Sequence, residues 1–275
     1  MRKRSTGQNP GHYSRIPWWT RMILVDWAVC IGVVIFELIV CNFAMNPYDR
    51  YIPDGLDQFQ TIQYPLKASI VPTWMLALIV GLIPLIVFTS FYARYRSLHD
   101  LHHACLGLVQ ALTMTMLFTD FLKVIVGRYR PDYAARVADG DKSSIHDGRL
   151  SFPSGHSSAS FCSMTFLSMY LCGKLRVFRK EGSPSWKLFI VLLPYAISSF
   201  VAVSRTMDYH HDFSDILGGT LIGLCFGGFI YFNNFNQLSS NKCALPKNRL
   251  YPNYSKDGLL LAEKDTSLLS IKVLG

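Results

Sequence analysis

Six apolar runs of about 20 residues recur along the 275-residue chain, and they decide what it can fold into. Each run is long enough to cross a hydrocarbon core of about 30 Å as a helix. The runs cover about residues 22–45, 69–92, 104–126, 151–175, 186–203 and 213–232. Half of the residues are hydrophobic and only 16% are charged, as membrane proteins require. We therefore expect an all-α, polytopic membrane protein with six transmembrane helices.

The polar segments outside these runs divide the chain into three parts. Residues 1–21 form a basic amino-terminal segment, 22–232 a six-span membrane domain, and 233–275 a polar tail. Trp18 and Trp19 stand immediately before the first run, where interfacial anchors are found. We expect no cleaved signal peptide, because the first run is too long and lacks a small-residue cleavage site.

The distribution of positive charge predicts an orientation in the membrane. With six spans, 18 of the 27 lysines and arginines fall on the side that holds both ends of the chain. The positive-inside rule then places both termini in the cytoplasm and the opposite loops on the lumenal or extracellular face. The net charge of +9 does not indicate nucleic-acid binding, because the basic residues are spread among loops and tails. The seven cysteines have neither CxxC nor metal-ligand spacing, so neither a disulfide framework nor a zinc site is expected.

A histidine and an aspartate before the last run have the spacing of a reactive pair. His211 and Asp215 are four residues apart, at the expected first turn of a helix, so the carboxylate can hold one ring nitrogen while the other points outward. Arg205, six residues upstream, is placed to grip an oxyanion bidentately. Such a pair is also a common helix cap or structural hydrogen bond, so this stretch alone leaves both interpretations open. His210 is the alternative nucleophile, but its i+4 neighbour, Ser214, cannot balance an imidazolium, so we favour His211.

A second basic stretch follows the third run. Pro131 biases Arg130 towards an extended conformation, so the helix should end near Gly127 and leave Arg130 on a loop. Lys123, which still belongs to the helix, should lie near the same helix end. The spacing from Lys123 and the following proline favour Arg130 over Arg128 as the anion ligand. Arg128 is then expected to be a rim or headgroup contact.

A third stretch opens the fourth run. Pro153 at a helix start, followed by Ser154 and Gly155, predicts a nest of free backbone N–H groups, to which the helix dipole adds positive potential. An anion would be well placed there, beside His156.

Separately, Glu37 lies inside the first run and needs a polar partner within the bundle.

The three stretches together read Lys-x6-Arg-Pro, Pro-Ser-Gly-His and Ser-Arg-x5-His-x3-Asp, each at a helix mouth on one membrane face. This tripartite pattern resembles the type 2 phosphatidic acid phosphatase superfamily. The six-span frame resembles the integral-membrane lipid phosphate phosphatases over about residues 20–232. The Gly-Arg-x-Arg-Pro-Asp form at 127–132 is similar to the fungal and plant diacylglycerol pyrophosphate and lipid phosphate phosphatases.

The resemblance implies metal-independent dephosphorylation of phosphatidate, lysophosphatidate or diacylglycerol pyrophosphate through a phosphohistidine. It implies that His211 is the nucleophile, that Asp215 orients it, and that His156 is the general acid. The residues expected to bind the phosphate are Lys123, Arg130, Ser154, Gly155 and Arg205. Three cations make a metal unnecessary, and no cofactor is expected. The expected partners are a lipid phosphate and the bilayer, while the oligomeric state is not indicated.

Other functions fit parts of the same pattern. A polyprenyl pyrophosphate, sphingoid-base phosphate or sugar phosphate phosphatase, or a phosphotransferase, is an alternative, since nothing in the sequence decides the lipid. Vanadium haloperoxidases resemble the same site because vanadate mimics phosphate, but they are soluble, and six spans argue against them. A non-catalytic membrane scaffold would require the loss of key residues, and here the full set is present.

Overall fold

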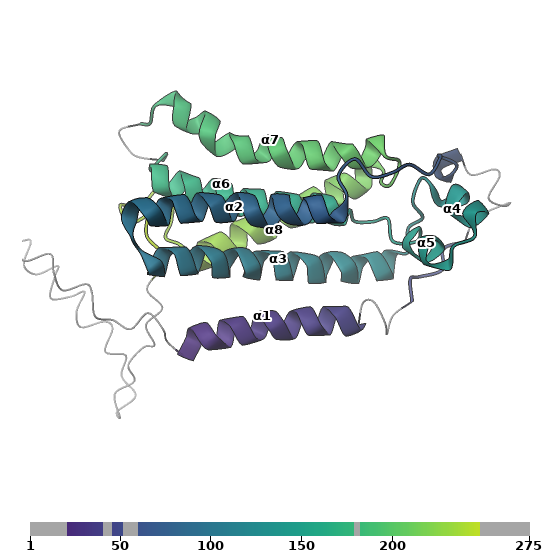
Figure 1. Cartoon of the computed structure of the whole chain (residues 1–275), viewed down its shortest axis with the longest axis horizontal. Helices are drawn as coiled ribbons and strands as arrows, with labels where there is room; N and C mark the ends of the chain where they lie inside the picture. The colour runs from purple at the N-terminus through teal and green to yellow at the C-terminus, as the bar shows by residue number, and fades with distance from the viewer. Residues whose placement is uncertain (1–20, 41–45, 52–59, 179–181, 248–275) are drawn as a thin grey trace, which may run out of the picture.

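The computed structural model describes residues 21–40, 46–51, 60–178 and 182–247, and these contain helices and loops but no strand (Figure 1). The helices are α1 (Arg21–Ile39), the 3-10 helix η4 (Gln60–Ile62), α2 (Thr73–Tyr95), α3 (Leu98–Val126), α4 (Tyr133–Asp139), α5 (Lys142–Asp147), α6 (Gly155–Leu175), α7 (Ser185–Met207) and α8 (Phe213–Asn234). The predicted all-α class is confirmed. The predicted segment 1–21, apart from its last residue, and the tail beyond 247 lie outside the described residues.

Each of the six apolar runs corresponds to a long helix, namely α1, α2, α3, α6, α7 or α8. Four of them, α2, α3, α7 and α8, are long and apolar enough to cross a membrane by length and composition. The chain is therefore a multi-pass membrane protein, whereas crossing by α1 and α6 stays a prediction. α6 is less apolar because it is the central helix, packed against α2, α3, α7 and α8, and its buried surface carries serine hydroxyls.

Three helices are longer than their apolar runs, and α8 exceeds its run by only two residues. α3 begins at Leu98 rather than near 104, because the side chain of Ser97 accepts a hydrogen bond from the Asp100 N–H and caps the helix. α7 continues to Met207, four residues beyond the predicted end near 203. Its last turn contains Arg205, a buried arginine. A prediction based on apolar residues ends before such a charged residue.

A seam of glycines holds α8 against α6. Gly219, Gly223 and Gly227 repeat every four residues along α8, and a Cβ added to any of them would lie within 2.4 to 2.6 Å of a carbonyl oxygen of α6 or its cap. Small residues at this spacing let two helix backbones touch. Where the seam reaches the helix ends, the Ser154 N–H donates to the carbonyl oxygen of Asp215 at 3.0 Å. The seam thus brings the start of α6 beside the start of α8.

The helix ends that carry the sequence motifs gather at one end of the bundle. α3 and α7 end there, α6 and α8 begin there, and the short helices α4 and α5 lie beyond them (Figure 1, right). At the opposite end, the segment after α8 turns back onto the bundle, where Phe235 and Cys243 are buried. The predicted tail is therefore packed against the bundle as far as the described residues extend.

Candidate active site

A cavity of about 350 Å³ lies at the end of the bundle where the motifs meet. It is lined by residues of α2, α3, α5, α6 and α7 and by the segments before α2, after α3 and before α8. The predicted site residues that line it are Lys123, Arg130, Gly155, His156, Arg205 and His211. Two further predicted residues, Ser154 and Asp215, are fully buried behind this lining.

His211 reaches the cavity from the loop before α8, not from its first turn. Asp212 is the N-cap of α8 and forms a capping box with Asp215, so His211 stands immediately before the N-cap, two residues before the helix. The prediction that both members of the pair belong to the first turn is therefore wrong for the histidine. Their relative placement is nevertheless as expected, since His211 Nδ1 faces Asp215 Oδ2 at 3.7 Å.

Ser151 joins the two members of this pair, because 3.7 Å is too long for a direct hydrogen bond. Its Oγ donates to Asp215 Oδ2 at 2.6 Å and lies 3.5 Å from His211 Nδ1. With Nδ1 turned towards the carboxylate, Nε2 is the nitrogen available to the cavity. Burial lowers the pKa of His211, so the imidazole is neutral and its lone pair can attack.

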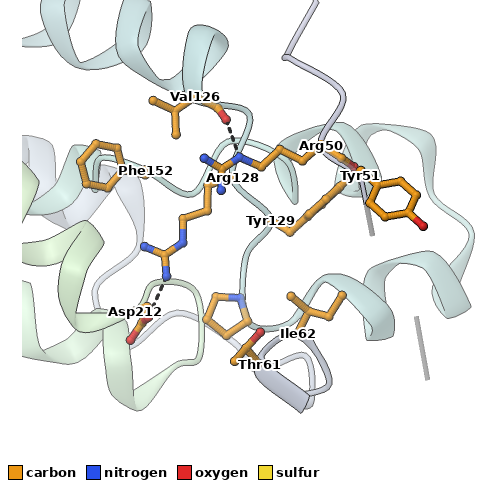
Figure 2. A pocket seen from close by; sticks show the side chains of 10 residues that line it. Arg50, Tyr51, Thr61, Ile62, Val126, Arg128, Tyr129, Phe152 and Asp212 are labelled. Atoms are coloured by element: carbon orange, nitrogen blue, oxygen red, sulfur yellow. Dashed lines mark hydrogen bonds and ion pairs between the residues drawn. The ribbon is translucent and has the colours of Figure 1, made fainter. Parts of the chain in front are cut away.

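Arg128 holds the other oxygen of the buried carboxylate. Its Nη1 donates to Asp215 Oδ1 at 2.8 Å, and its Nη2 donates to Asp212 Oδ2 at 2.8 Å, as Figure 2 shows for Asp212. The expectation that Arg128 is a rim or headgroup contact did not include this pairing of its guanidinium with the carboxylate behind His211. No spacing in the sequence links residues 128 and 215, but a carboxylate that is fully buried requires a cation.

The three predicted phosphate-binding cations each hold a carboxylate in the structure. The Lys123 Nζ lies 2.7 Å from Asp120, an Arg130 Nη2 lies 2.7 Å from Asp147, and an Arg205 Nη2 lies 2.7 Å from Asp208. The three carboxylates paired with these cations are therefore those of Asp120, Asp147 and Asp208. These pairs fix the direction of each cation before any ligand enters.

Asp147 is a cavity residue that the sequence pattern did not reveal. It lies at the end of α5, and its carboxylate bridges Arg130 and Arg136 at 2.7 and 3.0 Å. Arg136 in turn grips Asp132 with two hydrogen bonds of 2.9 Å. Burial raises the pKa of Asp147, but the guanidinium groups of Arg130 and Arg136 outweigh it and hold that pKa below its usual range. The α4–α5 segment therefore positions Arg130.

The start of α6 provides part of the predicted anion nest. The N–H of Ser154 is donated to the Asp215 carbonyl oxygen and its side chain caps the helix, so Ser154 is a structural residue and the prediction that its backbone binds phosphate is wrong. Gly155 fits the role, because it lines the cavity and a Cβ added to it would lie 3.2 Å from the Lys123 Nζ. A phosphate oxygen at this position would meet both an N–H and an ammonium.

The ring of His156 is oriented by a carbonyl group of the segment before α2. His156 Nε2 lies 3.0 Å from the carbonyl oxygen of Val71, so Nε2 carries a proton and donates it. The other nitrogen, Nδ1, is then the one that can exchange a proton with a ligand. This places a second histidine, with its own orienting contact, on the wall of the cavity.

His210 also lines the cavity, but its contacts differ from those of His211. Its Nδ1 donates to the backbone carbonyl oxygen of Asp208 at 3.0 Å, and no carboxylate is bonded to its ring in the described part of the chain. A neutral carbonyl stabilises an imidazolium less than a carboxylate does. This difference favours His211 as the nucleophile.

Two further findings concern buried charge and metals. Glu37 lies near Asp120 and Lys123 across the α1–α3 contact, so polar side chains are close to it inside the bundle. No group of three His, Cys, Asp or Glu side chains among the described residues could hold a metal ion. The cavity thus combines a neutral imidazole backed by a carboxylate, a second histidine and three cations, a set suited to transferring a phosphoryl group.

Comparisons with known proteins agree with this chemistry. The model of the PAP2 superfamily matches residues 103–238, which include every predicted site residue. The chain is 54% identical to a PA-phosphatase related-family protein of Dictyostelium discoideum, over 94% of this chain and 96% of that protein. It is 37% identical to lipid phosphate phosphatase 2 of Arabidopsis thaliana, over 78% of each. It is 31% identical to a probable diacylglycerol pyrophosphate phosphatase of Schizosaccharomyces pombe, over 78% of this chain and 81% of that protein. No solved structure matches the chain.

Proposed function

Because the chain belongs to the PAP2 superfamily, we propose that it is a membrane phosphatase that removes phosphate groups from lipid phosphates. The observation that carries the proposal is the single cavity onto which His211, His156 and three cations all converge. The names of the relatives support lipid phosphates and diacylglycerol pyrophosphate as the substrate class. Phosphatidate, lysophosphatidate and diacylglycerol pyrophosphate are the substrates we propose.

The proposed reaction proceeds through a phosphohistidine. Nε2 of His211 attacks phosphorus, the bond from phosphorus to the leaving oxygen breaks, and His156, which enters this step as an imidazolium protonated on both nitrogens, gives its Nδ1 proton to that oxygen. Asp215, held by Arg128 and Ser151, stabilises the imidazolium that forms. In the second step, His156 takes a proton from a water molecule, which attacks phosphorus and releases inorganic phosphate and neutral His211.

The cations carry the charge of the transferred group. Lys123, Arg130 and Arg205 lie around the cavity with the N–H of Gly155, where they would hold the three equatorial oxygens. Because their own carboxylates fix these side chains, they need little rearrangement when the substrate binds. Three full charges supply the stabilisation that a metal ion gives in other phosphoryl-transfer enzymes, so we propose a metal-independent reaction.

The same proposal includes the orientation in the membrane. Six spans with both termini in the cytoplasm would place the cavity at the lumenal or extracellular surface. The structure supports this arrangement because the four helix ends that carry the site lie at one end of the bundle (Figure 1). A lipid headgroup can enter there while its acyl chains stay in the bilayer.

The test is phosphate release from a panel of lipid phosphates in detergent micelles that contain EDTA. Wild type should release phosphate, and His211→Ala should release none at the same protein level. His146→Ala is a matched control, because His146 is exposed on α5 and does not line the cavity. Turnover by a well-folded His211→Ala protein would overturn the mechanism, and a need for added magnesium would contradict the metal-independent site. If no lipid is hydrolysed, the proposed substrate class is wrong.

A further inference from the structure

A second pocket, of about 510 Å³, is lined in part by the loop that follows α3 (Figure 2). Its described lining residues include none of those that line the catalytic cavity. The polar residues of its lining are Arg50, Thr61, Arg128 and Asp212, and the others are Tyr51, Ile62, Val126, Tyr129, Pro131 and Phe152. Because no histidine is among these residues, the pocket has no nucleophile of the kind found in the catalytic cavity.

Arg50 is held at the rim of this pocket by fixed contacts. Its Nε donates to the carbonyl oxygen of Val126 at 2.9 Å, and the Tyr129 hydroxyl donates to the Arg50 carbonyl oxygen at 2.8 Å (Figure 2). Two residues earlier, the Tyr48 N–H donates to the Val124 carbonyl oxygen at 3.0 Å. The Tyr48 backbone lies so close to Gly127 that a Cβ there would be 2.1 Å from its carbonyl oxygen. The segment around Arg50 is thus docked on the end of α3.

Within the described part of the chain, the positive charge of Arg50 is available to a ligand. Two other arginines on this face are neutralised, since Arg128 pairs with Asp212 and Asp215, and Arg149 pairs with Asp49. Among the described residues, by contrast, no carboxylate forms an ion pair with Arg50. A guanidinium that already donates through Nε still presents both terminal nitrogens, and the group that they fit best is a phosphate or a carboxylate.

Exposed apolar side chains stand next to the pocket lining in the chain. Val126 ends α3 and Asp212 caps α8, and their chain neighbours Ile125 and Phe213 are exposed. Phe152 rests on α8, with its ring 2.7 Å from the position of a Cβ added to Gly218. A ligand in this pocket therefore has a cation beside its polar group and an apolar surface below it.

We propose that this pocket binds the phosphate of a second, non-reacting phospholipid, a phosphodiester whose acyl chains lie against α3 and α8. Arg50 contacts the phosphate, and the rings of Tyr51, Tyr129 and Phe152 cover the glycerol and the upper part of the chains. A phosphodiester fits because it carries one negative charge, which Arg50, a lining arginine that pairs with no carboxylate among the described residues, can balance. This proposal does not depend on catalysis in the other cavity.

The test measures binding of radiolabelled phosphatidylglycerol to the full-length protein in detergent micelles. Arg50→Gln should weaken binding about tenfold or more, since it removes a charge-assisted contact. Arg149→Gln removes the same charge from the same face without lining the pocket, and Arg130→Gln removes it from the catalytic cavity. Both should bind phosphatidylglycerol within about twofold of wild type. Arg50→Lys keeps the positive charge but not the two terminal nitrogens of the guanidinium, so it should lose less affinity for phosphatidylglycerol than Arg50→Gln.

Competition separates a lipid site from a simple phosphate site. Unlabelled phosphatidylglycerol should displace the label. Inorganic phosphate, which has no acyl chains, and diacylglycerol, which has no phosphate, should not. Equal losses in Arg50→Gln and Arg149→Gln would show non-specific attraction to positive charge and would overturn the proposal. A loss confined to Arg130→Gln would place the lipid in the catalytic cavity. Displacement by inorganic phosphate would show that the pocket takes free phosphate and not a lipid.

Discussion

Replacing Arg128 with glutamine tests whether a residue that contacts no part of the catalytic cavity positions the nucleophile. Arg128 donates to one oxygen of Asp215, a carboxylate that is 0% exposed. A hydrogen bond to a charged group contributes about 1.5 to 3 kcal/mol. The Arg128 side chain is 29% exposed, so water screens the pair and the lower half of this range, about 1.5 to 2 kcal/mol, applies. At about 1.36 kcal/mol per tenfold change in rate, kcat should fall about 10- to 30-fold.

The split between kcat and KM identifies the role. A positioning residue lowers kcat while KM for phosphatidate in mixed micelles stays within about threefold of wild type. Arg128→Lys should recover part of the rate, because it restores a charge near Asp215 without the second hydrogen bond. Arg149→Gln is the control for the loss of one surface charge. If Arg128→Gln raises KM and leaves kcat within about twofold, Arg128 is a substrate contact and the reasoning from Asp215 is wrong.

Two further predictions concern stability, and thermal unfolding in micelles checks both. Gly223→Ala should destabilise the protein by about 1 to 3 kcal/mol, because the new Cβ would lie 2.5 Å from the Ser158 carbonyl oxygen. Gly228→Ala, whose Cβ meets nothing closer than 3.8 Å, should not, and equal effects would refute the role of the seam. Burial lowers the pKa of His211, so its contribution to stability is complete above the unfolded value of about 6.5 and is lost as pH falls through the folded value. The unfolding midpoint of wild type should therefore drop more steeply between about pH 7 and about pH 5 than that of His211→Gln, and parallel curves would contradict this linkage.

The sequence predicted the long helices and most of the site because both depend on local patterns. An apolar run of about 20 residues and a proline after Arg130 act on the backbone nearby, so the end of α3 at Val126 followed from residues a few positions away. The motif residues at the ends of α3, α6 and α7 and before α8 meet because those ends lie on one side of the bundle. Alternating spans alone require that arrangement.

The parts that the sequence did not predict are contacts between distant segments. Arg128 and Asp215 are 87 residues apart, and Ser151 and Asp215 are 64 apart, so no local spacing relates them. The same holds for the Ser154 N–H, which looked free in a helix-start pattern but is bonded across the glycine seam. Packing decides which polar groups remain available, and packing is not local.

The charge balance of the two pockets bears on which phosphate each one takes. In the catalytic cavity, Arg130 already holds Asp147. Three carboxylates pair with the three cations, and among the described residues Asp147 is the one of them that lines the cavity. A phosphate there must compete with a carboxylate, so the doubly charged group of a monoester gains more than the single charge of a diester does. In the second pocket, Arg50 has no such competitor among the described residues, so a single charge suffices. Under the two proposals, monoesters would enter the cavity that contains His211, whereas diesters would bind where no histidine is among the lining residues.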